Sequence, residues 1–265
     1  MKRLPYVGLV TPLCLLMVAD GTNAGDEVQV KAQIGGVVTG QIVFEGDPPK
    51  IEPLVEAGST RLRDAAVCAA QDIPNETVLV HPESKGIANV FVYLPRSLVA
   101  APEARPQDEK PLEFTIENCR FRPHASFVRT GRTVEAKSED PIATNLRTEP
   151  RRNDRVNVIV KPKGAPGDMI SMRFERPEPE PIVVASDLHP WMRSYWLVLD
   201  HPYGAITDEH GKFRIENLPA GTHKFVVWHE RAGFLDREYE VTLEEGRPVE
   251  LPPYNVPRAR FTDRD

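Results

Sequence analysis

Short segments of alternating apolar and polar residues run along most of the chain and predict β-strands. Between residues 35 and 45, GGVVTGQIVFE, the side chains alternate between two faces, and the GDPPK sequence that follows has turn chemistry. Further strand candidates recur about every ten residues, which favours β-sandwiches. Their ranges are 77–80, 89–94, 112–119, 125–138, 155–162, 169–175, 181–186, 196–200, 213–221, 222–230 and 237–246.

Helical patterns are almost missing from the sequence. The chain holds 26 prolines in 265 residues, and proline is unfavourable inside helices. The segment LRDAAVCAA, residues 62–70, is compatible with one short helical turn. Residues 100–111 have no periodicity and are predicted to be a linker or long loop, and residues 252–265 a tail of low structural content.

Composition narrows the function classes. Hydrophobic residues make up 40% and charged residues 27% of the chain, as in ordinary globular proteins of one large or two small domains. The formal net charge is -6. Because the sequence has no basic stripe, we expect no nucleic-acid partner.

The N-terminus has the pattern of a secretory signal peptide, residues 1–24. Lys2 and Arg3 precede a short apolar stretch, and small residues surround a cleavage site after Ala24. We therefore expect a periplasmic or secreted protein with no membrane span after cleavage. The alternative is a membrane anchor, although the apolar stretch is shorter than the roughly 20 residues that spanning needs.

Cleavage after residue 24 leaves two cysteines, Cys68 and Cys119. An even count in an exported chain predicts one disulfide between them. Two buried free thiols are the alternative.

Two groups of motifs resemble known families. The segments CRFRPH (119–124), SEDPIATN (138–145) and SDLHPWMRSYWLVLDHPY (186–203) resemble the cupredoxin-like proteins of bacterial secretomes. The segment AITDEHGKFRIENLPAGTHKFVVWHE (205–230) resembles the carboxypeptidase regulatory-like, or prealbumin-like, domain. The strands at 35–45 and 89–94 also resemble the opening strands of that second family.

The resemblance implies an all-β protein of two sandwiches. Residues 34–96 together with 200–251 would form the prealbumin-like sandwich, and residues 111–199 a cupredoxin-like Greek-key sandwich inserted into it. The first strand would then pair with strands from residues 205–250. Two tandem domains that meet near His201 are the alternative arrangement.

The cupredoxin resemblance implies a copper site at four positions. The family binds copper through an early His-Asn pair and a Cys-x-x-His-x-x-Met loop. Here these positions hold Thr144, Ser186, His189 and Met192, so a histidine and the cysteine are replaced. Since blue copper needs two imidazoles and a thiolate, we expect no metal cofactor. The alternative is a weak copper site at His189 and Met192 completed by a third group such as His124 or Met172.

Other side chains with possible chemistry have a simpler interpretation. Ser186, Asp187 and His189 lie in one loop without a nucleophile-elbow pattern, so we expect no catalytic residues. His201 and His229 could form hydrogen bonds near the domain junction. A sugar-stacking surface is also possible, although core packing is the commoner role of such aromatic residues. The candidate binding surface comprises Trp191, Trp196, His201, Tyr203, Trp228 and His229.

The sequence therefore favours a non-catalytic exported protein that keeps a cupredoxin scaffold and has lost blue copper. Its partner would be an unidentified protein or a cell-wall glycan. A copper-binding electron carrier and a carbohydrate-binding module are the alternatives, because a fold alone does not decide function.

Overall fold

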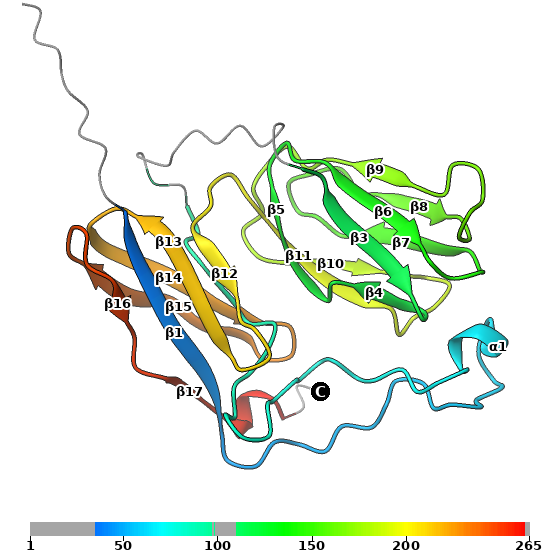
Figure 1. The fold of residues 1–265 in the computed structure, drawn as a ribbon, viewed down its shortest axis with the longest axis horizontal. Coiled ribbons are helices and arrows are strands. Elements are labelled where there is room, and N and C mark those ends of the chain that lie inside the picture. Colours follow the sequence, from blue (N-terminus) through cyan, green and yellow to red (C-terminus); the bar gives the residue numbers. More distant parts are fainter. Residues whose placement is uncertain (1–34, 97, 99–109, 263–265) are drawn as a thin grey trace, which may run out of the picture. The chain divides into compact units, whose positions relative to one another are not determined.

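The computed structural model describes residues 35–96, 98 and 110–262, and the regular secondary structure of these residues is almost entirely β-strand (Figure 1). The expected all-β class with two sandwiches is therefore confirmed. The predicted signal peptide and most of the predicted linker lie outside the described residues. In the described part, no helix is long and apolar enough to cross a membrane.

The first sandwich is made of strands from both ends of the chain. One sheet has the order β13-β1-β16, with β17 also paired to β1, and the other has the order β12-β2-β14-β15. The strand bounds are β1 Gly36–Glu45, β2 Phe91–Tyr93, β12 Gly204–Ile206, β13 Lys212–Leu218, β14 Gly221–His229, β15 Gly233–Leu243, β16 Val249–Glu250 and β17 Tyr254–Pro257.

The second sandwich is built only from the middle of the chain. Its two sheets have the orders β5-β11-β10-β7-β8 and β4-β3-β6-β9. The strand bounds are β3 Leu112–Glu117, β4 Arg120–Arg122, β5 Ala125–Arg129, β6 Val134–Ser138, β7 Thr144–Thr148, β8 Asn157–Val160, β9 Ile170–Met172, β10 Ile182–Ala185 and β11 Arg193–Leu199.

The first strand pairs as expected with the C-terminal part of the chain. β1 is antiparallel to β13, with Gly40 opposite Phe213 and Val38 opposite Ile215. The alternating pattern explains the burial, because Val38, Ile42 and Phe44 face the core while the residues between them are partly exposed.

The C-terminal segment is more ordered than the sequence predicted. Within residues 252–265, β17 runs parallel to β1, and a 3-10 turn follows at Arg258–Arg260. Val256 and Phe261 are buried, and the Phe261 ring lies 5.2 Å from that of Phe44. Because prolines and arginines surround these apolar residues, the sequence has no alternating pattern that would predict a strand here. The predicted strand at 77–80 is also wrong, because Val80 makes only an isolated bridge to Ile87.

A long excursion between β1 and β2 reaches the second sandwich. It carries the short helix α1, Ala65–Cys68, and returns through a bridge between Val55 and Ile73 (Figure 1). Val55, Ile73 and Cys68 are buried in the core of the second sandwich. The predicted disulfide between Cys68 and Cys119 is present, with Cα atoms 5.3 Å apart, and it attaches this excursion to the end of β3.

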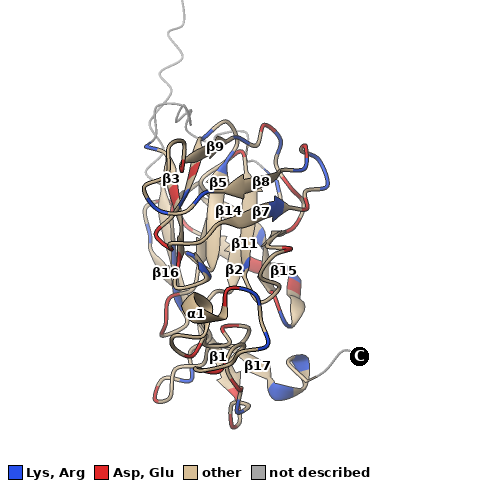
Figure 2. Cartoon of the chain, turned by 90° about the vertical axis from the view of Figure 1, so that its right-hand side faces the viewer, with Lys and Arg blue, Asp and Glu red and all other residues tan. Residues whose placement is uncertain are grey.

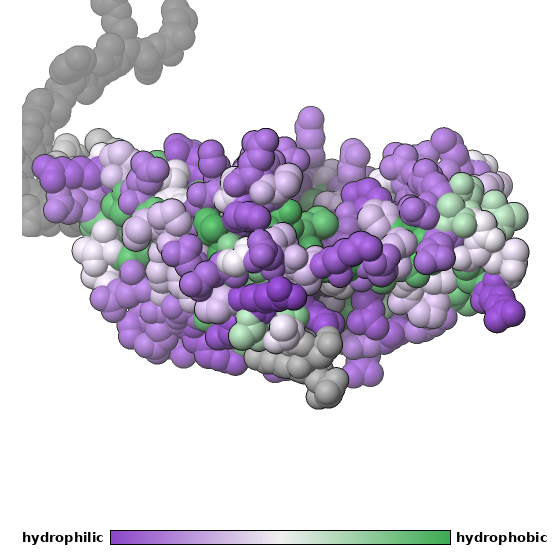
Figure 3. All heavy atoms as spheres, turned by 90° about the horizontal axis from the view of Figure 1, so that it is seen from below, coloured by the Kyte–Doolittle hydropathy of each residue, from purple (hydrophilic) through white to green (hydrophobic). Residues whose placement is uncertain are grey.

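Where the two sandwiches meet, apolar side chains form a separate cluster. Phe91 and Tyr93 of β2 pack with Leu197 and Leu199 of β11. Gly204 allows a close approach there, since a Cβ at this position would lie 2.8 Å from the Phe127 ring. The face seen in Figure 3 is mostly hydrophilic, with apolar residues visible in the hollows between polar ones.

Candidate functional site

The four positions expected from the cupredoxin resemblance lie together at one end of the second sandwich. Thr144 begins β7, while Ser186, His189 and Met192 belong to the loop between β10 and β11. This loop is a tight turn closed by the Met192 N–H, which donates to the His189 carbonyl at 2.9 Å. All four side chains are buried.

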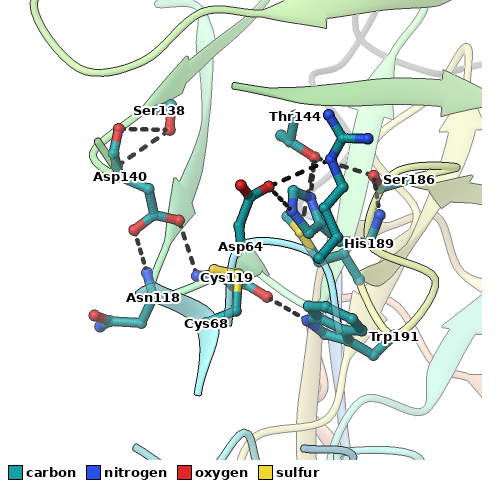
Figure 4. The surroundings of a disulfide bond; sticks show 12 residues. Asp64, Cys68, Asn118, Cys119, Ser138, Asp140, Thr144, Ser186, His189 and Trp191 are labelled. Atoms are coloured by element: carbon teal, nitrogen blue, oxygen red, sulfur yellow. Dashed lines mark hydrogen bonds and ion pairs between the residues drawn. A yellow bond between two sulfur atoms is a disulfide. The ribbon is translucent and has the colours of Figure 1, made fainter. Parts of the chain in front are cut away.

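The Thr144 hydroxyl is the centre of this group (Figure 4). Its Oγ1 lies 2.9 Å from His189 Nδ1, 3.0 Å from Ser186 Oγ and 3.9 Å from Met192 Sδ. Ser186 Oγ also donates to Asn145 Oδ1 at 2.9 Å and accepts from the His189 N–H at 3.0 Å. The side chains at these positions thus form hydrogen bonds with one another and with Asn145.

Asp64 covers the other edge of the imidazole. Its Oδ2 lies 3.0 Å from His189 Nε2, and its backbone is left-handed at φ 54° where α1 begins. A carboxylate acceptor at Nε2 places the ring proton there, so Nδ1 accepts from the Thr144 hydroxyl. The indole N–H of Trp191 donates to the Cys119 carbonyl at 3.1 Å, beside the disulfide (Figure 4).

These residues do not fit a blue copper ion. The donor set is two neutral hydroxyls, one imidazole nitrogen and one thioether, without a thiolate. Of the groups offered as a third ligand, His124 pairs with Glu230, and Met172 belongs to β9 in the opposite sheet. Within residues 35–96 and 110–262, no group of three or more His, Cys, Asp or Glu side chains could hold a metal.

The aromatic binding surface expected from the sequence is wrong for most of its members. Trp196 and Tyr203 are fully buried, and Trp228 is 8% exposed. Trp196 packs edge-on against Phe114 in the core, with ring centroids 4.7 Å apart, and Trp228 packs against Phe91 where the sandwiches meet. Only Trp191 is partly exposed.

The two histidines expected near the junction are both buried but do not bond to each other in the described part of the chain. His201 stacks on Tyr203 at 5.7 Å, and His229 packs against Phe261 at 5.2 Å. Each Nδ1 instead accepts a backbone N–H two residues on, from Tyr203 and Arg231 respectively. Both histidines therefore hold loops through hydrogen bonds to the backbone. The sequence had suggested only that they form hydrogen bonds near the junction.

His229 should make stability depend on pH. Burial, and to a lesser extent the nearby His124, lowers the pKa of His229 from 6.5 to about 3. Between these values the unfolded state binds a proton that the folded state excludes, so the free energy of unfolding falls as pH falls. From about pH 6.5 to about pH 5 we expect a loss of about 1.5 kcal/mol, measured by urea unfolding.

The control for this prediction is His229→Asn, whose side-chain oxygen can still accept the Arg231 N–H that His229 Nδ1 binds. The variant should lose stability less steeply over the same interval. An unchanged slope would show that other groups cause the pH dependence.

The sequence predicted four members of this site but missed Asp64. Its carboxylate meets His189 only because the excursion folds back over the sandwich, 125 residues away along the chain. The position of Asp64, four residues before Cys68, is the single sequence feature that could have indicated this contact.

Comparison with known proteins gives only structural relatives. No known family matches the sequence, and no curated protein matches it. Among solved structures, a copper-containing nitrite reductase from Thermus scotoductus is similar at 18% identity and TM-score 0.29, over 35% of this chain and 23% of that one. A purple cupredoxin from Nitrosopumilus maritimus is similar at 16% identity and TM-score 0.27, over 33% and 99%. A reduced amicyanin mutant is similar at 14% identity and TM-score 0.29, over 36% and 89%.

Proposed function

We propose that this chain is a non-catalytic, exported protein on a cupredoxin-like scaffold that has lost blue copper and acts as a structural or binding module. The observation that carries the proposal is the contact between Thr144 Oγ1 and His189 Nδ1. A hydroxyl occupies the coordination direction of the imidazole and cannot supply the charge or softness of the missing ligands.

The domain assignment is part of the same proposal. Residues 34–96 with 200–251 would be a carboxypeptidase regulatory-like sandwich that holds the inserted unit 111–199. Two observations support it: β1 and β2 precede residue 97 and their partners follow residue 203, while strands from 112 to 199 pair only with one another in the described residues. Export is supported by the buried disulfide and the N-terminal sequence pattern.

Metal analysis with an absorption spectrum tests the proposal. We expect protein purified from the periplasm to hold no stoichiometric copper, and added Cu(II) to give no intense thiolate-to-copper charge-transfer band. Cys68 and Cys119 cannot supply the thiolate, because they are joined to each other. A blue protein would contradict the proposal and favour the electron carrier.

A further inference from the structure

A second site lies beside the first, in a cavity of about 340 Å³. The volume falls in the range of small-molecule pockets, which begins at about 300 Å³. Three parts of the chain line it: the excursion after β1, the second sandwich and the loop after β14. The lining combines apolar side chains with acidic, basic and imidazole groups: Leu54, Ile73, Trp191, Glu76, Glu230, His124, Arg120, Arg193 and Arg231.

One wall of this cavity is apolar and rigid. Trp191 lines the cavity together with Leu54 and Ile73 of the excursion. The hydrogen bond from its indole N–H to the Cys119 carbonyl, 3.1 Å long, fixes the ring in place. A fixed, partly exposed indole suits the apolar face of a small ring, since little side-chain entropy is lost on binding.

Charged side chains also line the cavity, and its two carboxylates already have partners. Glu76 pairs with Arg120 and with Arg122 at 3.5 Å. The His124 imidazole pairs with Glu230 through Nε2, and its Nδ1 lies 3.7 Å from Glu76. The cationic Arg120 beside Glu76 offsets the charge of that carboxylate toward an incoming anion.

Positive charge in the same cavity remains available. The Arg193 side chain lies near the Tyr195 hydroxyl and forms no ion pair with a carboxylate in the described part of the chain. Arg120 and Arg231 also line the cavity, and the Arg120 guanidinium is already paired with Glu76. The chain as a whole has a net charge of -6, and acidic and basic residues are interspersed on the face in Figure 2, so this local excess is not a general property of the surface.

We propose that this pocket binds a small sugar acid, with the carboxylate on Arg193 and the ring on Trp191. A planar guanidinium binds a carboxylate in a bidentate manner, which a hydroxyl cannot imitate. The Asn75 and Thr77 side chains line the same cavity and supply polar groups for ring hydroxyls. The proposal is independent of the loss of copper.

Calorimetric titration with sodium glucuronate tests it, with glucose and acetate as probes that each lack one half of the ligand. We expect saturable binding of glucuronate and at least about tenfold weaker binding of the other two. Arg193→Gln should weaken glucuronate binding by about tenfold or more, as expected for loss of a charge-assisted pair. Arg193 is exposed, so the variant should fold normally.

The matched control is Arg214→Gln, an exposed strand arginine that lies outside this cavity and should leave binding unchanged. Lack of saturation up to about 10 mM glucuronate would overturn the proposal. So would equal binding of glucose or acetate, or unchanged affinity in the Arg193 variant. Absence of copper from the same samples would leave the proposed function intact, so the two proposals can fail separately.

Discussion

Replacing Thr144 by His and Ser186 by Cys is expected to create a copper protein with an intense thiolate-to-copper absorption band. The two new ligands would start from positions whose side-chain oxygens are 3.0 Å apart, next to His189 Nδ1 and Met192 Sδ. The result is two imidazoles, a thiolate and a thioether, the donor set of a blue centre. We expect one copper per chain in the double variant and none in the parent.

The scaffold favours this outcome because the surrounding contacts do not depend on the replaced hydroxyls alone. The Met192 N–H still closes the loop on the His189 carbonyl, and Asn145 Oδ1 still accepts the Asp187 N–H at 2.8 Å. The Asp64 carboxylate at Nε2 orients His189 with Nδ1 toward the new ligands, as outer carboxylates do in metal sites.

Two variants serve as controls. Thr144→His with Ser186→Ala lacks the thiolate and should stay colourless, and Ser186→Cys alone lacks the second imidazole and should bind copper more weakly. Thiol titration of the unfolded double variant should find one free thiol, which excludes exchange with the Cys68–Cys119 disulfide. A folded but colourless double variant would show that the loop no longer has the geometry that copper requires.

Much of the fold could be predicted because burial and hydrophobic period coincide in this chain. The alternation in β1 gives one buried side, and the apolar runs that became β10 and β14 are buried over most of their length. β7 was seen only as part of a motif, since TNLRT offers a single aliphatic residue, and four of its five side chains are nevertheless buried. They are buried because polar partners satisfy them, which a hydropathy pattern cannot reveal.

Some residues of the candidate sites could also be predicted from local sequence, and others could not. Loop spacing brings Ser186, His189 and Met192 together, because a single turn determines their positions. The sequence favoured core packing for most of the aromatic residues, and the burial of Trp228 agrees with it. The partners of Trp228 depend on the packing of the two sandwiches, which no local pattern predicts. The pocket at Arg193 is lined by residues from three distant segments, so no local motif in the sequence could predict it.

Removal of the disulfide is expected to lower the free energy of unfolding by about 4 kcal/mol, the chain-entropy estimate for a loop of about 50 residues. The cysteines are 51 residues apart and both are buried, so Cys68→Ala with Cys119→Ala is the appropriate variant. Urea unfolding of this variant, of the parent and of the parent with a reductant would measure the loss. A loss below about 1 kcal/mol would contradict the estimate.

The same variant should also loosen the cover over His189. Asp64 lies four residues before Cys68, so hydrogen exchange should accelerate across residues 54–73 while β10 and β11 stay protected. Asp64→Ala is the matched control, because it removes the acceptor at His189 Nε2 but keeps the disulfide. We expect both variants to make His189 reactive toward an imidazole reagent, which would show that Asp64 shields the ring. Only the double cysteine variant should accelerate exchange, which would show that the disulfide holds the segment. Equal exchange in all three proteins would show that the buried Val55 and Ile73 hold the segment without the disulfide.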